Sequence, residues 1–96
     1  MMMMKWDGFT IDQYEQVRKA LDWENHKPDG AVFHACAYDG QAFRVTDIWE
    51  SAELLNNFVQ GRLIPATMQI GAQGTPQVEV CPLHAVYVPE NAALTV

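Results

Sequence analysis

Residues 30–51 read GAVFHACAYDGQAFRVTDIWES, and this stretch decides the fold. Two runs rich in Ala, Val, Phe and Thr flank Asp39-Gly40, and the second run leads directly into Ser51. An Asp-Gly pair between strand-like runs predicts a β-hairpin with a two-residue turn. A turn of that length fixes the register of the strands, and the register decides which side chains share a face.

With Asp39-Gly40 as the turn, strand alternation divides the hairpin into two faces. One face carries Val32, His34, Cys36, Phe43, Val45, Asp47 and Trp49. The other carries Ala31, Phe33, Ala35, Ala37, Ala42, Arg44, Thr46 and Ile48. In this register His34 lies opposite Val45 and diagonal to Asp47, with about 7–8 Å between backbones and within side-chain reach.

The rest of the chain predicts one further strand and one helix on each side of the hairpin. Residues 2–6 form a first strand, and Thr10 with Gln13 forms a capping box that begins a helix. Ser51 begins a second helix, which should break or kink near Pro65, and residues 77–88 form the last strand. We expect the tail after Pro89 to pack weakly. The order β-α-β-β-α-β predicts an α+β, ferredoxin-like fold with a four-stranded antiparallel sheet in a single domain, residues 1–96.

Composition argues against several classes of partner. The 96 residues carry a formal charge of −6, and the six Lys and Arg form no cluster. That balance disfavours both nucleic acid and anionic membrane surfaces, and no apolar run reaches the roughly 20 residues of a spanning helix. Two cysteines are too few for a disulfide framework, so the cytoplasm is the expected compartment.

His34 and Asp47 are the candidate catalytic pair. An imidazole oriented by a carboxylate in apolar surroundings is suited to act as a general base. The alternative is that Asp47 only satisfies a half-buried His34, because buried polar groups usually find a partner without reacting. Trp49 on the same face is either part of the core or a stacking surface for a ligand.

A metal site is not expected within one subunit. The sequence offers His34, Cys36, Cys81 and His84 as ligands. In a ferredoxin-like sheet the second and fourth strands are the two edges, about 14 Å apart, whereas zinc ligands must lie about 2.0–2.3 Å from one ion. The same separation argues against a Cys36–Cys81 disulfide.

The segment Arg44–Ser51, followed by a helix with Phe58 on its inner face, resembles the dimeric α/β-barrel superfamily. This superfamily includes the antibiotic-biosynthesis-monooxygenase-like proteins, and the similarity is greatest to small uncharacterised bacterial members. The resemblance also includes residues 8–14 and 30–34. Its members oxidise aromatic polyketides without a cofactor, isomerise small lactones or open haem.

The resemblance implies a homodimer whose sheets face each other and a pocket between each sheet and its own helices. His34, Asp47 and Trp49 would lie on the floor of that pocket. Ala31, Phe33, Ala35 and Thr46 would face the partner. Haem is not implied, because Val59 stands where the haem-degrading members have a ligating His. We therefore expect no cofactor. The expected ligand-binding residues are Trp49, Val32, Cys36, Phe43, Val45 and Phe58.

Three functions remain open. The first is a cofactor-independent enzyme, monooxygenase-like or isomerase-like, acting on a small apolar or aromatic molecule, with His34 as base and Asp47 as its orienting partner. The second is a non-catalytic protein that binds a small molecule in the same pocket. The third is an interaction module in which His34 and Asp47 only fix the strand register.

Overall fold

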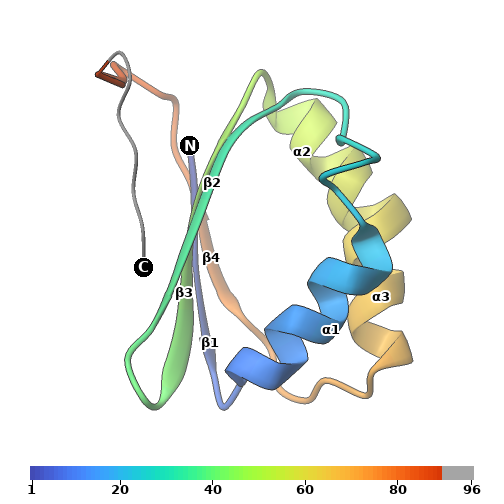
Figure 1. The fold of residues 1–96 in the computed structure, drawn as a ribbon. Coiled ribbons are helices and arrows are strands. Elements are labelled where there is room, and N and C mark those ends of the chain that lie inside the picture. The colour runs from blue at the N-terminus through green and yellow to red at the C-terminus, as the bar shows by residue number, and fades with distance from the viewer. Residues whose placement is uncertain (90–96) are drawn as a thin grey trace.

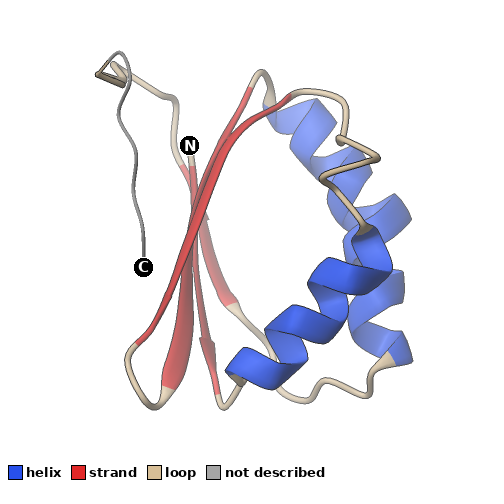
Figure 2. Cartoon of the chain, in the orientation of Figure 1, coloured by secondary structure: helices blue, strands red, loops and turns tan. Residues whose placement is uncertain are grey.

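A four-stranded antiparallel sheet with helices on one face makes up the computed structural model, which describes residues 1–89 (Figure 1). The strands are ordered β2-β3-β1-β4, so β2 and β4 are the sheet edges, as predicted. The helices lie together on one side of the sheet (Figure 2). The elements are β1 Met2–Asp7, α1 Ile11–Leu21, β2 Ala31–Tyr38, β3 Ala42–Trp49, α2 Ala52–Phe58, η1 Val59–Leu63, α3 Ile64–Gln69 and β4 Gln77–Val80.

The topology is the α+β, ferredoxin-like arrangement that the sequence predicts. The prediction for the tail after Pro89 lies outside the described residues. Among the described helices, none combines the length and the apolar character that crossing a membrane requires.

Both predicted helix starts are confirmed. The Thr10 hydroxyl accepts a hydrogen bond from the Gln13 backbone N–H at 3.1 Å, and the Gln13 side chain accepts one from the Thr10 backbone N–H at 3.0 Å. Ser51 accepts from the Leu54 backbone N–H at 3.1 Å. Each cap satisfies a donor that the first turn leaves free, which stabilises a helix by about 1 kcal/mol.

The second helical segment changes its winding where the sequence predicts a break. The α-helix α2 widens into the π-helical turn η1, and α3 follows with Pro65 in its first turn. Proline lacks an N–H and is tolerated in a first helical turn. The chain therefore accommodates Pro65 by a local change of helix type, while the helix continues.

The β2–β3 turn differs from the prediction. Tyr38 pairs with Phe43, so four residues, Asp39 to Ala42, lie between the two members of this last pair, where the sequence predicts two. The Asp39 carboxylate accepts hydrogen bonds from the backbone N–H groups of Ala42 and Gln41, each at 2.9 Å. These bonds, together with the Arg44 guanidinium, lower the pKa of Asp39 to about 2. An aspartate that bonds to the backbone ahead of it stabilises this wider turn.

The wider turn moves the predicted register by two residues. His34 lies directly opposite Asp47, and Cys36 lies opposite Val45, which corrects the diagonal arrangement. Because side chains alternate with a period of two, a two-residue shift leaves the paired side chains from Phe33 onward on their predicted faces.

A β-bulge in β2 produces a second difference. The register shifts between Ala31 and Phe33, so that Ala31 pairs with Trp49 and Val32 is the extra residue. Ala31 was predicted to face the partner, yet the bulge turns it toward the helices. Phe33 pairs with Ile48 on the other face, and its side chain remains 46% exposed.

The last strand is shorter than predicted. It ends at Val80, whereas the sequence predicts pairing as far as residue 88. Two further bonds join Cys81 to Met1. The Cys81 N–H donates to the Met1 carbonyl at 2.9 Å, and the Met1 amino group donates to the Cys81 carbonyl at 2.7 Å, after which Pro82 removes a donor. Residues 81–89 continue without regular structure on the side of the sheet away from the helices (Figure 1).

Candidate functional site

A cavity of about 270 Å³ lies between the sheet and the helices. Its wall is mostly apolar and includes seven aromatic side chains from the helix-facing side of the sheet and from the helices and loops, namely Trp6, Phe9, Tyr14, Trp23, Phe43, Trp49 and Phe58. Phe33 also borders the cavity, although its side chain belongs to the other face of the sheet. All three tryptophans of the chain therefore line it. The polar lining residues are Tyr14, Lys27, His34, Asp47 and Thr67. An apolar cavity with a few convergent polar groups is the usual form of a small-molecule site.

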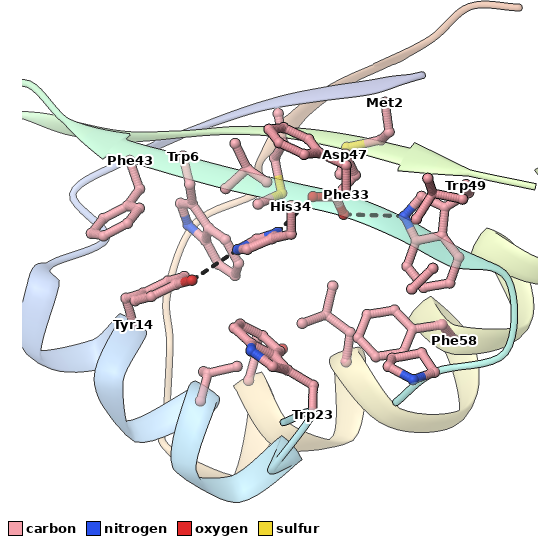
Figure 3. A pocket seen from close by; sticks show the side chains of 18 of the residues that line it. Met2, Trp6, Tyr14, Trp23, Phe33, His34, Phe43, Asp47, Trp49 and Phe58 are labelled. Atoms are coloured by element: carbon pink, nitrogen blue, oxygen red, sulfur yellow. Dashed lines mark hydrogen bonds and ion pairs between the residues drawn. The ribbon is translucent and has the colours of Figure 1, made fainter. Parts of the chain in front are cut away.

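A chain of hydrogen bonds crosses the sheet side of the cavity (Figure 3). The Tyr14 hydroxyl lies 2.8 Å from His34 Nε2, and His34 Nδ1 lies 2.6 Å from Asp47 Oδ1. The Trp49 indole N–H donates to Asp47 Oδ2 at 3.2 Å. Four side chains from α1, β2 and β3 are thus linked in series.

The chemistry of these groups fixes the direction of the bonds. An ionised carboxylate only accepts hydrogen bonds, so the proton between His34 and Asp47 belongs to His34 Nδ1. In a neutral imidazole the other nitrogen, Nε2, is then an acceptor, and the Tyr14 hydroxyl donates to it. The arrangement therefore holds His34 in a single tautomer, with its basic nitrogen facing Tyr14.

Asp47 is the buried end of this chain. It is 7% exposed and is the one buried charged residue among residues 1–89. Both of its oxygens accept a hydrogen bond, which offsets much of the cost of burying a carboxylate. Trp49 thus has a role that the sequence did not indicate, because its indole N–H holds the carboxylate in place. Its ring also packs against Phe58, with ring centroids 5.1 Å apart.

Tyr14 completes the hydrogen-bond chain, although it is not among the predicted site residues. Its ring stacks on Phe43 with ring centroids 4.9 Å apart. Burial raises the pKa of its hydroxyl well above the ordinary value, and the neighbouring Cys36 thiol acts in the same direction. The hydroxyl therefore stays protonated and available as a donor. The signal that could have revealed this role is a tyrosine on the apolar face of the first helix, which packs on the strand face that carries His34 and Asp47.

Most of the predicted site residues lie around this cavity. His34, Asp47, Trp49, Val32, Phe43, Val45 and Phe58 all line it. Cys36 shares the strand face and lies opposite Val45, but it is not a lining residue. Over residues 1–89, no three His, Cys, Asp or Glu side chains are grouped to hold a metal ion.

The helix side of the cavity includes Val17, Phe58, Leu63, Thr67 and residues of the loop between α1 and β2. Figure 3 shows Phe58 across the open space from Asp47, with Trp23 on the same side as Phe58. Arg62 in η1 anchors this loop, because its guanidinium donates to the carbonyls of Leu21 at 2.7 Å and His26 at 3.0 Å. The anchored loop holds Trp23 against the site, and the ring centroids of Trp23 and His34 are 4.9 Å apart.

Comparison with known proteins supports the fold and does not assign a function. No protein-family model matches the sequence, and no curated protein matches it. A solved structure that resembles the chain is the crystal structure of NE2512, a protein of unknown function from Nitrosomonas europaea. The two share 18% sequence identity with a TM-score of 0.71, over 94% of this chain and 93% of that one. At that identity the similarity shows a shared ferredoxin-like fold alone.

Proposed function

We propose that the protein is a cofactor-independent enzyme that moves a proton on a small aromatic or otherwise apolar molecule. The observation that carries this proposal is the Tyr14–His34–Asp47 hydrogen-bond chain in the wall of an apolar cavity. Removal of a proton from an activated C–H or O–H bond is the first step of an isomerisation and also of an oxygenation without a cofactor. The proposal therefore covers both the isomerase-like and the monooxygenase-like functions that the family resemblance implies.

The geometry supports a relay in which Tyr14 contacts the substrate. Since the hydroxyl of Tyr14 occupies His34 Nε2, the imidazole meets the substrate through that hydroxyl. The substrate proton passes to the Tyr14 oxygen while the Tyr14 proton passes to His34 Nε2, which leaves a substrate anion and an imidazolium. The Asp47 carboxylate stabilises the imidazolium through Nδ1–H.

The size of the cavity indicates the size of the substrate. A cavity of roughly 150 Å³ in a protein core accommodates benzene. A volume of about 270 Å³ therefore suits a molecule of one or two rings. The seven aromatic side chains in the wall favour a flat ligand that can stack between the sheet side and the helix side.

Deuterium incorporation tests this proposal without knowledge of the natural substrate. The protein is incubated in D₂O with a panel of one- and two-ring aryl ketones and aryl lactones, and deuterium uptake is measured by mass spectrometry. We expect at least one member to exchange faster than in buffer, and Tyr14→Phe to slow that exchange. If Tyr14→Phe leaves the rate unchanged, Tyr14 is not on the proton path.

The alternative function is binding without turnover. It is favoured by the same apolar wall, because a stacking pocket binds a ligand whether or not a proton moves. Binding of panel members with no exchange above the buffer rate would support this alternative and contradict the enzymatic proposal.

We also propose that the protein works as a homodimer through the sheet face away from the helices. The support is the exposed apolar surface on that side, where Phe33, Leu83 and Val86 are 46%, 41% and 55% exposed. A patch of this kind, next to a free sheet edge at β2, is typical of a protein interface.

Native mass spectrometry at micromolar concentration checks the dimer. We expect the wild-type protein to be dimeric and Phe33→Glu to be monomeric, because the substitution places a charge in the proposed interface. Ala20→Glu adds the same charge on the exposed surface of α1 and should leave the dimer intact. A monomeric wild-type protein would refute the proposed assembly.

A further inference from the structure

Among the described residues, Lys27 is the one Lys or Arg that lines the cavity. It lies in the loop between α1 and β2, three residues before the buried Gly30, and it is exposed to solvent. Besides Lys27, the polar lining residues are Tyr14, His34, Asp47 and Thr67. Lys27 therefore offers a ligand an ammonium group on the solvent-exposed part of the wall.

The charge of Lys27 is not used elsewhere in the described chain. Three of the six Lys and Arg form ion pairs with carboxylates, namely Lys5, Arg18 and Arg44, and Arg62 donates to two backbone carbonyls. Lys27 and Lys19 form no ion pair or side-chain hydrogen bond with any of residues 1–89. Of these two, only Lys27 lines the cavity.

The backbone around Lys27 is held in place on both sides. The carbonyl of His26, the preceding residue, accepts a hydrogen bond from Arg62, and Pro28, the following residue, is buried and lines the cavity. A cation on an anchored backbone loses less conformational entropy on pairing than one on a mobile loop. The long stem of the lysine can lie along the apolar wall with its ammonium group in water.

Asp47 does not oppose a negatively charged ligand group beside Lys27. Its side chain is 10% exposed, and its charge is already shared with the N–H groups of His34 and Trp49. Asp47 lies on the sheet side of the cavity, whereas Lys27 belongs to the loop on the helix side. The net charge of −6 disfavours an anionic ligand. Binding of such a ligand therefore needs a positive charge close to it, and Lys27 can supply that charge.

We infer that the ligand is an aromatic acid of one or two rings, with its carboxylate paired to Lys27 and its reactive proton directed toward Tyr14. This inference rests on the proposed use of the cavity as a small-molecule site. It adds a charge requirement that the proposed proton transfer does not itself demand.

Two probes of the same shape test the charge requirement. The affinities of 1-naphthoate and of its neutral isostere 1-naphthamide are measured by isothermal titration calorimetry at low salt. Quenching of tryptophan fluorescence locates the probe, since all three tryptophans line the cavity. We expect naphthoate to bind about fivefold more tightly, the upper range for a solvent-accessible ion pair.

The variants Lys27→Gln and Lys19→Gln separate the local charge from the net charge. Both remove one positive charge from an exposed position, so both should fold normally. We expect Lys27→Gln to abolish the preference for naphthoate without changing the affinity for naphthamide, and Lys19→Gln to behave as wild type.

The outcomes distinguish failure of this inference from failure of the proposed function. If both probes bind equally well to the wild type, or if Lys27→Gln keeps the preference, the charge requirement is wrong while the cavity remains a binding site. If neither probe binds, both the inference and the proposed small-molecule site are refuted.

Discussion

Replacing His34 by Gln is expected to lower the rate of deuterium incorporation by about 10² to 10⁴-fold, the usual contribution of a general base. Glutamine is similar in size and can still contact Tyr14 and Asp47, but its amide does not accept a proton at neutral pH. The hydrogen-bond chain would then be interrupted at the group that takes the proton. The rate is measured by mass spectrometry on the panel member that exchanges fastest with the wild type.

His84→Gln is the matched control for this substitution. His84 lies exposed in residues 81–89 and does not line the cavity, so its replacement should leave the exchange rate unchanged. Far-UV circular dichroism and thermal unfolding of both variants establish that they are folded. A His34→Gln protein that is folded and exchanges at the wild-type rate would exclude His34 from the chemistry.

Gly30→Ala is expected to lower the free energy of unfolding by about 2–4 kcal/mol, from backbone strain and overpacking together. Gly30 has φ +87°, and a Cβ there would lie 2.6 Å from Leu54 Cδ1 and 2.8 Å from Leu54 Cβ. Because Leu54 Cβ is attached to the backbone of α2, rotation of the leucine cannot remove the second clash. The Gly30 carbonyl also accepts the Glu50 N–H at 2.8 Å, so any shift disturbs the junction of β2 with the end of β3.

Gly61→Ala provides the control for the glycine substitution. Gly61 lies in η1, and a Cβ there would meet nothing within 4 Å. Replacing a helical glycine of this kind should leave stability unchanged or raise it by up to about 1 kcal/mol. Urea unfolding of the two variants measures the difference, and a Gly30→Ala protein as stable as Gly61→Ala would show that the predicted clash is absent.

The faces of the β2–β3 hairpin were predictable from the sequence, although its register was not. Asp39-Gly40 marks the turn, and the period-two alternation places His34 and Asp47 on one face for any shift by an even number of residues. Whether Asp39 begins a two-residue or a four-residue turn depends on bonds from its side chain to Gln41 and Ala42. A turn that is stabilised by such side-chain bonds competes closely with the two-residue turn, so the residue types alone do not decide between the two turns.

The remaining differences arise from tertiary contacts. A bulge at Val32 has no local signal, since valine is an ordinary strand residue. The role of Tyr14 depends on how α1 lies over β2, which helical periodicity does not specify. The end of β4 was partly predictable, because Pro82 follows it closely and marks an edge or a bulge.

The protonation state of His34 tests the central claim most directly. Nitrogen-15 NMR at a pH where the imidazole is neutral should find the proton of the wild type on Nδ1, directed to Asp47. In Asp47→Asn the amide oxygen must face the Trp49 N–H, because an indole N–H only donates. The amide NH₂ then faces His34 and donates to Nδ1, so the imidazole proton must move to Nε2. Wild-type protein with its proton on Nε2, or an Asp47→Asn variant with the wild-type tautomer, would contradict the hydrogen-bond chain on which the proposed function depends.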